Sequence, residues 1–238
     1  MIDFKLYEGK LEDLPPGYQK LICHIIFDVK MGENFYCKYQ IVAVGHKTAT
    51  PSSLTYSSVV YWYSLRTDLT IYTLNDLNLL ECDIQNAYLT AKFREKIWTV
   101  SGTEFGTEQG SLILVVRSLY VLKSSGAAFR DLLAKQLHYF GYRPSIDDPD
   151  VWMRTSFKPG GLMYYEYVIC YVDGVLCISD DPLCTMKGIQ AKLKLKGYKI
   201  EKLDMYLGAY FSKTTNIDGQ ECWGISSDKY CMEAVTNV

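Results

Sequence analysis

Two aspartates each end an apolar run that is typical of a buried β-strand. Asp83 ends the run that starts at Leu79, and Asp173 ends the run that starts at Tyr164. If these strands are neighbours, the two carboxylates can hold Mg²⁺, which commonly takes one or two carboxylates plus waters and substrate phosphates. Such metal sites serve phosphoryl or nucleotidyl transfer, where two ions clamp the attacking and leaving oxygens. The alternative is structural, with Asp173 as a turn residue and Asp83 as a strand-end cap.

The other acids, histidines and cysteines indicate no second site. The acids of 147–150 and 180–181 adjoin prolines and are predicted to lie in solvated turns. The three histidines are scattered, and no Ser, His and Asp set has the context of a nucleophile elbow, so a hydrolytic triad is not supported. The eight cysteines include no Cys-x-x-Cys pair. They favour reduced, core-filling thiols of an intracellular protein over zinc ligands or disulfides.

The composition indicates a globular chain without a general affinity for polyanions. Its 238 residues are 48% apolar and 22% charged, which excludes bulk disorder and allows one large core or two small ones. The net charge of −2 excludes a globally cationic surface but not a locally basic groove. No signal peptide or membrane span is visible, so we expect neither membrane association nor secretion. Without repeats or a flexible linker, one continuous domain is the simplest interpretation.

Hydrophobic patterning predicts the elements of the first third of the chain. Apolar runs at 21–27 and 34–44 predict a β-hairpin. Ser57 and Ser58 are predicted to cap a helix. The apolar positions of this helix recur at helical spacing, at Leu65, Leu69 and Tyr72.

Two more helices are predicted in the second half. The first follows Ser124 and Ser125 and stops at Gly141, with an apolar stripe interrupted only by Gln136. That stripe consists of Phe129, Leu132, Leu133, Leu137 and Phe140. The second begins near Thr185 and stops at Gly197. Its inward positions are Met186, Ile189 and Leu193.

Lysines gather on the flank of this second helix and in the segment after it. They are Lys187, Lys192, Lys194, Lys196, Lys199 and Lys202. Glu201 is the one acid among them. One interpretation is a solvated helix face. In a polymer-binding protein the same lysines would form the wall that faces the phosphates.

The pattern of elements favours an α+β fold. Asp173-Gly174 between two apolar runs is a strong signal for a tight antiparallel hairpin. Such a pair among alternating strands and helices predicts an antiparallel sheet with helices packed on one face. The chain has no Gly-rich phosphate loop of the Rossmann or Walker type that would favour a parallel nucleotide-binding sheet.

Four short motifs follow one another along the chain. They are Asp-Ile-Gln-Asn-Ala-Tyr-Leu at 83–89, Leu-Tyr-Val-Leu-Lys at 119–123, Tyr-Val-Asp-Gly at 171–174 and Tyr-Leu-Gly at 206–208. In this order and at these distances they resemble the palm motifs of copia-type retrotransposon reverse transcriptases. Residues 41–46 resemble part of that family's fingers, and the resemblance runs from about Leu14 to the end of the chain.

The resemblance implies a right-hand polymerase fold of fingers and palm, with helices on one face of an antiparallel palm sheet. The implied fingers cover about 14–75 and 95–122, and the implied palm covers about 76–94 and 123–212. The length leaves no room for ribonuclease H or integrase regions. Residues 1–238 would then be a single, truncated reverse transcriptase domain of a longer polyprotein.

The resemblance also implies roles for individual residues. Asp83 and Asp173 would be the catalytic aspartates that bind Mg²⁺, and Tyr88 would be the bulky gate that rejects a 2′-hydroxyl. A continuing strand would put Tyr88 and Asp83 on opposite faces, so we expect the backbone to bend at Gln85-Asn86.

Further implied contacts involve two lysines and a primer grip. Lys123 and Lys38 would contact the nucleotide, although Lys123 can equally be an exposed surface lysine. The implied primer grip consists of Tyr206, Leu207 and Gly208.

Three departures from the family pattern predict weak or absent catalysis. Gly174 stands where the family has a second hairpin aspartate, Gln40 where it has an arginine that faces the triphosphate, and Val121 where it has a glycine. Stabilisation by a metal ion is worth several kcal/mol, and about 1.4 kcal/mol changes a rate tenfold, so a weakened site predicts a loss of a hundredfold or more.

Three hypotheses follow from these residues. The first is an impaired RNA-directed DNA polymerase that uses Mg²⁺, deoxynucleotide triphosphates and a primed RNA or DNA template, and that adjoins other polyprotein domains. The second is a non-catalytic module that holds nucleic acid on its lysine face. The third is the product of a decayed element without a selected function. The expected location is intracellular, in cytoplasmic virus-like particles or in the nucleus.

Overall fold

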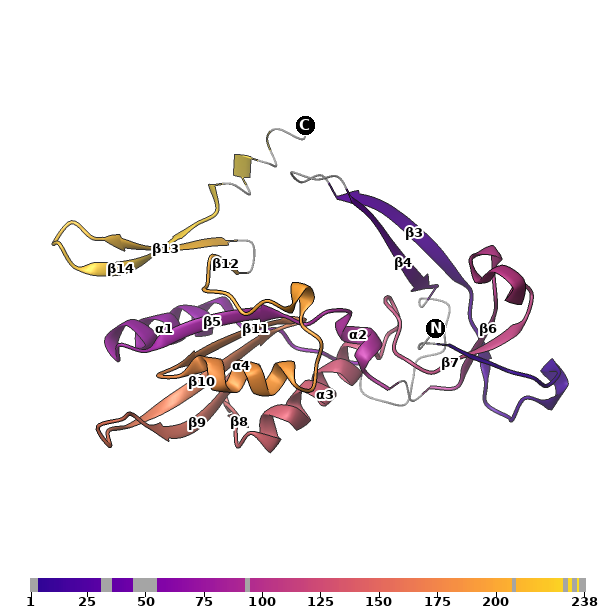
Figure 1. Cartoon of the computed structure of the whole chain (residues 1–238), viewed down its shortest axis with the longest axis horizontal. Helices are drawn as coiled ribbons and strands as arrows, with labels where there is room; N and C mark the ends of the chain where they lie inside the picture. The colour runs from indigo at the N-terminus through magenta and orange to yellow at the C-terminus, as the bar shows by residue number, and fades with distance from the viewer. Residues whose placement is uncertain are drawn as a thin grey trace. The chain divides into compact units, whose positions relative to one another are not determined.

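The computed structural model describes residues 4–30, 36–44, 55–92, 95–206, 209–228, 231–232 and 235 (Figure 1). The chain forms two compact units. The first consists of Met1–Ser57 and Asn86–Ala134, and the second of Ser58–Gln85 and Lys135–Val238. The whole is a mixed α and β fold with several sheets and few helices. The interpretation as fingers and palm, with the boundaries given above, stays a prediction.

A four-stranded sheet forms the centre of the first unit. Its strands, in spatial order, are β1 (Phe4–Leu6), β7 (Leu112–Val115), β6 (Ile97–Val100) and β2 (Gln19–Lys20). Only β2 is parallel to its neighbour. Short 3₁₀ turns lie at η1 (Leu11–Asp13) and η3 (Thr103–Glu108). The core of this unit consists of Leu21, Ala43, Ile97, Val115, Leu119 and Leu122.

The predicted N-terminal hairpin is confirmed. Strands β3 (Cys23–Lys30) and β4 (Tyr36–Ala43) pair antiparallel, with Cys23 opposite Ala43. The short helix α2 (Ala87–Thr90) also belongs to this unit. Helix α3 (Ser125–Tyr139) contributes residues to both units, and it confirms the predicted apolar stripe because Phe129, Leu133 and Leu137 are buried.

A five-stranded antiparallel sheet forms the centre of the second unit (Figure 1). Its strands, in spatial order, are β5 (Asn78–Asp83), β11 (Gly174–Ser179), β10 (Met163–Tyr171), β9 (Val151–Phe157) and β8 (Arg143–Pro144). The hairpin of β10 and β11 thus inserts β11 between β10 and β5. Residues 175–178 of β11 are fully buried, so both faces of this strand need cover.

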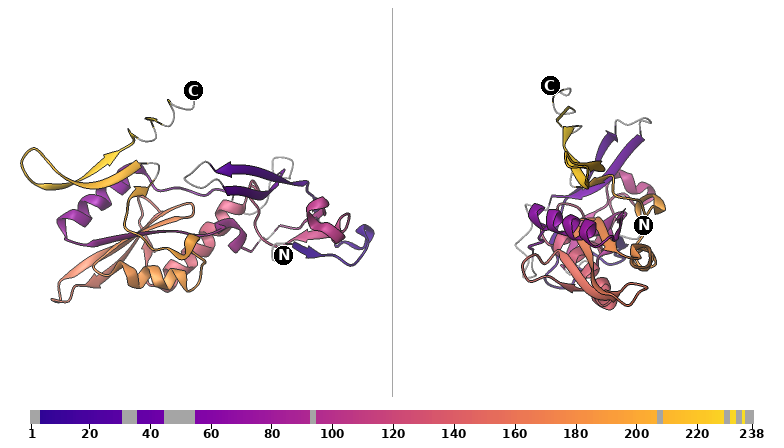
Figure 2. Two further views of the ribbon diagram at one scale, coloured as in Figure 1. Left: turned by 45° about the horizontal axis from the view of Figure 1, so that its top comes forward. Right: turned by 90° about the vertical axis from the view of Figure 1, so that its left-hand side faces the viewer.

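Helices cover both faces of this sheet, and the prediction of helices on one face was wrong. Helix α1 (Trp62–Leu74) shares a hydrophobic core with Leu79 and Leu176. Helix α4 (Pro182–Gln190) contacts the opposite face, where Met186 Sδ lies 3.5 Å from Cys82 Sγ. Leu79 and Cys82 are three positions apart on β5, so their side chains point to opposite faces of the sheet. The helices that contact them, α1 and α4, therefore lie on opposite faces, as the ribbon shows (Figure 2). A uniformly apolar β11 cannot leave one face exposed to solvent.

A small antiparallel sheet completes the α1 side of the second unit. Its strands are β12 (Met205–Tyr206), β13 (Ala209–Thr215) and β14 (Glu221–Ser226). Tyr206, Ala209 and Phe211 extend the core shared by α1 and the large sheet. The 3₁₀ turn η4 (Lys196–Tyr198) lies between α4 and β12 in the chain.

Two helix starts differ from the prediction. Ser57 and Ser58 do not cap α1, because its N-cap residue is Tyr61. The Tyr61 N–H instead donates to Asp148 Oδ2 at 2.9 Å. Helix α4 begins at Pro182, whose fixed φ and missing N–H suit a first helical turn, and ends at Gln190, before Gly197.

The prediction that acids 147–150 lie in a solvated turn was also wrong for two of them. Asp148 and Asp150 are each 3% exposed. Asp148 is buried because it accepts hydrogen bonds from the backbone of Tyr61 and Asp150, which helps to hold the start of α1. All eight cysteines are free, but only Cys82, Cys170 and Cys177 are buried.

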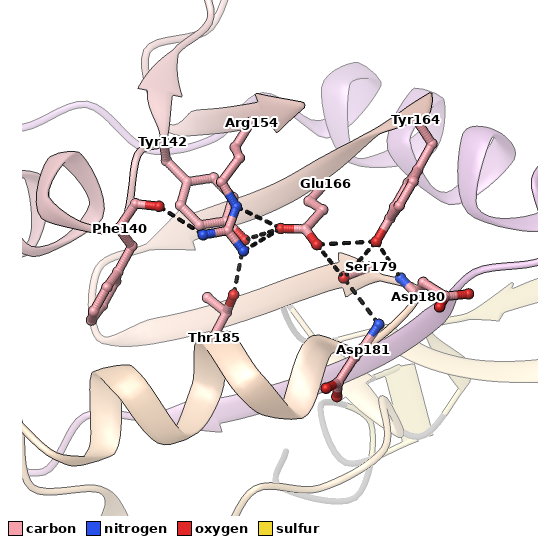
Figure 3. Close-up of polar contacts among 9 residues, drawn as sticks. All are labelled: Phe140, Tyr142, Arg154, Tyr164, Glu166, Ser179, Asp180, Asp181 and Thr185. Carbon is pink, nitrogen blue, oxygen red and sulfur yellow. Dashed lines mark hydrogen bonds and ion pairs between the residues drawn. The ribbon is translucent and has the colours of Figure 1, made fainter. Parts of the chain in front are cut away.

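A buried carboxylate joins α4 to the large sheet (Figure 3). Glu166 on β10 is 5% exposed and accepts hydrogen bonds from four side chains. The donors are Arg154 at 2.7 Å, Ser179 at 2.9 Å, and Tyr142 and Tyr164 at 3.0 Å. Tyr142 also bonds Thr185 of α4 at 3.0 Å. Burial opposes ionisation, but the bonds from Arg154 and Ser179 lower the pKa of Glu166 below its ordinary value.

Among the described residues, no helix combines the length and apolar character needed to cross a bilayer.

Candidate active site

The structure brings Asp83 and Asp173 to the same end of two adjacent strands. In the β5–β11 ladder, Gly174 lies opposite Asp83. The Ile84 N–H donates to the Asp173 carbonyl at 2.8 Å, so the backbones stay paired just beyond the strand ends. Both aspartates are exposed and line a cleft of about 930 Å³ within the second unit.

The hairpin turns one residue earlier than predicted. Tyr171 pairs with Gly174, so the two loop residues are Val172 and Asp173. Gly174 pairs with Tyr171 on one side and with Asp83 on the other, and it is therefore a strand residue. Val172 has φ +53°, a left-handed conformation that costs a β-branched residue on the order of 1–3 kcal/mol.

The space beside Gly174 can accept a side chain. A Cβ at this position would lie 3.4 Å from the Tyr171 carbonyl oxygen and from Tyr206 Cε2, which is ordinary contact. It would lie 3.7 Å from Asp83 Oδ1. Gly174 is outside the left-handed region of φ, so its backbone also accepts an L-residue. A carboxylate on residue 174 would therefore lie next to Asp83.

A lysine pairs with Asp83 inside the cleft. Lys196 Nζ lies 3.1 Å from Asp83 Oδ2, and both side chains are more than half exposed. Lys199 and Lys202 line the same cleft, and Lys199 pairs with Glu201 at 3.0 Å. Sequence reasoning grouped these lysines as one basic face and did not single out Lys196.

Glu81 is a further acid of the cleft that the sequence analysis missed. It lies two residues before Asp83 on β5, which places both side chains on one face of the strand. Burial raises the pKa of Glu81 to about 7, with smaller contributions from the charges of Asp83, Glu201 and Asp204, against a backbone hydrogen bond from Asp204 that lowers it. The sequence signal for Glu81 was its spacing from Asp83, because residues two apart on a strand share a face.

Tyr206 supplies a buried hydroxyl to the same cleft. Its side chain is 6% exposed, and the hydroxyl has no hydrogen-bond partner among the described residues. Burial, followed by the charges of nearby groups that include Glu81 and Asp83, raises the pKa of Tyr206 well above its ordinary value. Leu207 and Gly208, the other two residues of the predicted primer grip, lie outside the described residues.

The donor set fits a small hard cation only in part. Within the described ranges, no group of three or more His, Cys, Asp or Glu side chains is placed to hold a metal ion. Asp83 and Asp173 are two carboxylates on one cleft, and Mg²⁺ can be held by one or two carboxylates when water and phosphate complete its shell. The two carboxylates therefore meet the minimum donor set for one Mg²⁺ and leave the rest of its shell to water and phosphate.

The other predicted site residues belong to the first unit. Asn86 has φ +52°, a left-handed conformation that turns the chain between β5 and α2. This turn is the predicted bend. Tyr88 follows on α2 and packs edge-on against Tyr120, with ring centroids 5.2 Å apart. Lys123 is exposed just before α3. Lys38 lies opposite Asp28 in the β3–β4 ladder, and its side chain is outside the described part of the chain.

Comparisons with known proteins relate the chain to retrotransposon polyproteins. It is 27% identical over 192 residues to the Retrovirus-related Pol polyprotein from transposon TNT 1-94 of Nicotiana tabacum, covering 78% of this chain and 14% of that protein. It is 30% identical over 141 residues to the Transposon Ty1-GR3 Gag-Pol polyprotein of Saccharomyces cerevisiae, covering 59% of this chain and 7% of that protein. No family model matches the chain. The similarity supports an origin in a copia-type element, and the chain spans about one seventh or less of these relatives.

Proposed function

We propose that the chain is the reverse transcriptase domain of a copia-type retrotransposon polyprotein, with impaired nucleotidyl transfer. The observation that carries this proposal is the pairing of Asp83 with Gly174 at the start of β11. This pairing brings Asp173, the preceding residue of the hairpin, to the same cleft as Asp83. The order of the four sequence motifs and the retrotransposon relatives support it.

In this proposal Asp83 and Asp173 would hold Mg²⁺, which would stabilise the charge that develops when a primer 3′-hydroxyl attacks the α-phosphate of a deoxynucleotide triphosphate and pyrophosphate leaves. Tyr88 limits the space for a 2′-hydroxyl, and Lys38 and Lys123 contact the nucleotide. Tyr206, Leu207 and Gly208 hold the primer end. The partners are a primed RNA or DNA template and the other domains of the polyprotein, inside the cell.

The impairment has a physical basis at Gly174. With no carboxylate at this position, no third acid among the described residues is grouped with Asp83 and Asp173 in an arrangement that could hold a second ion. Gln40 removes a charge that an arginine would hold in fixed geometry. The proposal therefore predicts little template-directed synthesis by the natural chain.

A combined reversion tests the proposal. Gly174→Asp, Gln40→Arg and Val121→Gly together should produce Mg²⁺-dependent incorporation of labelled nucleotide on a primed template, at least about a hundredfold above the natural chain. The matched control replaces Gly174→Asp by Gly174→Asn, which has the same size without the charge. Adding Asp83→Asn to the reverted chain should abolish synthesis. Absence of any gain in the reverted chain refutes the proposal.

A non-catalytic role in binding nucleic acid is the second candidate. It is favoured by the lysines that line the cleft and by Gly174, which puts no carboxylate at the start of β11. This role predicts duplex binding that weakens steeply with salt and is unchanged by the three reversions. Fluorescence anisotropy with a labelled primer–template at several salt concentrations measures it. Binding that survives Lys196→Gln, Lys199→Gln and Lys202→Gln together without a change in salt slope contradicts it.

A further inference from the structure

The segment after α4 is fastened along the outer edge of β5. The Gln85 N–H donates to the Lys194 carbonyl at 2.8 Å, and Ile84 forms an isolated bridge with Leu195. At the other end, Glu81 and Glu201 exchange two backbone hydrogen bonds of 2.8 and 3.0 Å. The edge strand of the sheet is thus covered by backbone pairing at two points.

Between these two points the segment bulges over Asp83. Two residues, 82 and 83, lie between Glu81 and Ile84. Five residues, 196–200, lie between their partners Leu195 and Glu201. The extra residues form the η4 turn, in which Gly197 has φ +63° and allows the sharp reversal. Lys196 is the first residue of this bulge, so its backbone is held directly beside the strand that carries Asp83.

This anchoring distinguishes Lys196 from the other lysines of the cleft. Its ammonium lies 3.1 Å from Asp83 Oδ2, whereas Lys199, of similar exposure, pairs with Glu201. The two lysines therefore carry the same charge in the same cleft, but only Lys196 has this ion pair with the proposed metal ligand.

A divalent cation on Asp83 would compete with the Lys196 ammonium, because two cations on one carboxylate repel each other at close range. Asp83, Asp173 and Lys196 together carry a formal charge of −1 instead of −2. Because position 174 is glycine, Asp173 is the one carboxylate of the hairpin, and the loss of one negative charge weakens cation binding more than it would with two.

We propose that Lys196 is an internal counter-ion of Asp83 that competes with the divalent cation. This inference rests on the proposed function, since it concerns the same site. The pair holds the cleft in a metal-poor state until the ammonium moves away from Asp83, and it weakens metal binding independently of any later chemical step.

Manganese binding tests the inference without measuring activity. Mn²⁺ replaces Mg²⁺ at oxygen sites, and its free concentration is measured by electron paramagnetic resonance during titration of the full chain. Lys196→Gln should bind Mn²⁺ about two- to fivefold more tightly than Lys199→Gln, the range expected for loss of one partly exposed ion pair. Lys196→Arg, which keeps the charge, should bind no more tightly than the natural chain.

The controls separate the inference from the proposed function. If Asp83→Asn abolishes binding while Lys196→Gln and Lys199→Gln tighten it equally, or neither tightens it, the counter-ion inference is wrong and the site at Asp83 stands. If Asp83→Asn binds Mn²⁺ as tightly as the natural chain, the ion is held elsewhere and both proposals fail. Circular dichroism of each variant checks that the exposed substitutions leave the fold intact.

Discussion

Val121 has a conformation that suits glycine. Its φ is +73°, and its side chain is 61% exposed, so it contributes little to the core. A left-handed φ at a β-branched residue costs on the order of 1–3 kcal/mol in strain. A glycine adopts this φ without strain, and its cost is the larger conformational entropy that it loses on folding, roughly 0.5–1 kcal/mol. Val121 is therefore a source of strain in the first unit.

Val121→Gly should raise the free energy of unfolding by about 1 kcal/mol, because it relieves this strain at the loss of little buried surface. Urea denaturation followed by circular dichroism measures the change. Val121→Ala is the matched control, since it keeps the Cβ and should give less than half of the gain. Equal gains for Gly and Ala would assign the effect to the side chain and not to φ.

Asp68 on α1 carries a carboxylate that the fold keeps from water. It is 4% exposed, and its Oδ2 has no hydrogen-bond partner among the described residues. Burial, followed by the charge of Asp148, raises the pKa of Asp68 to about 7. The folded state therefore binds a proton that the unfolded state releases near pH 4. This contribution to stability is full below about pH 4 and is lost as the pH rises to about 7.

Asp68→Asn should remove this pH dependence. The variant is expected to match the natural chain near pH 4 and to exceed its free energy of unfolding by on the order of 3 kcal/mol at pH 8. Urea unfolding at a series of pH values measures the difference. Asp76→Asn, at an exposed position just beyond the same helix, should give a constant small difference. A difference for Asp68→Asn that does not grow between pH 4 and pH 7 contradicts the assignment.

At the scale of elements, the central strand β11 explains why the sheet needs cover on both faces. Its four buried apolar residues have no polar alternation, so α1 covers one face and α4 the other. Glu166 and its donors link the α4 face to β9, β10 and β11 (Figure 3). The depressed pKa of Glu166 means that this link contributes stability above the ordinary pKa and loses it as the pH falls through the lower folded-state value.

Glu166→Gln should lower the free energy of unfolding by about 2–4 kcal/mol at pH 7, because Arg154 would lose its buried counter-charge. Part of the Arg154 side chain reaches solvent, which keeps the loss below that of a fully buried pair. Chemical denaturation measures it. Glu201→Gln breaks the exposed pair with Lys199 and should change stability by less than about 1 kcal/mol. Similar losses for the two variants would show that the Glu166 network is not a special support of α4.

At the scale of the whole molecule, the chain passes between the two compact units three times, at 57–58, 85–86 and 134–135. Each unit nevertheless has a hydrophobic core of its own. Ile97 is fully buried in the first unit and Ile169 in the second. Separate cores predict that each unit can open without the other, since local opening follows the contacts within a cooperative region.

Ile97→Ala and Ile169→Ala should each lower stability by about 2–5 kcal/mol in their own unit. Hydrogen exchange measured by mass spectrometry should then show faster exchange mainly in peptides of the first unit for Ile97→Ala and of the second unit for Ile169→Ala. Faster exchange throughout the chain for both variants would mean that the two units unfold as one.

Local patterns were sufficient for several features of this protein. Two apolar runs predicted the β3–β4 hairpin, and helical spacing predicted the buried stripe of α3, because both signals depend on neighbours within a few residues. The position of Asp83 at the end of an apolar strand was also predicted, as was the bend at Asn86. These features depend on short stretches of chain whose side chains favour one conformation.

Other features depended on segments that meet only after folding. Asp148 is buried because it accepts a bond from Tyr61, 87 positions away in the chain, and no local pattern distinguishes it from a solvated turn acid. The Lys196–Asp83 pair joins residues 113 positions apart and arises from the pairing of the segment after α4 with the edge of β5. Burial and charge pairing are properties of the surroundings, and a linear pattern specifies those surroundings only where the chain contacts itself nearby.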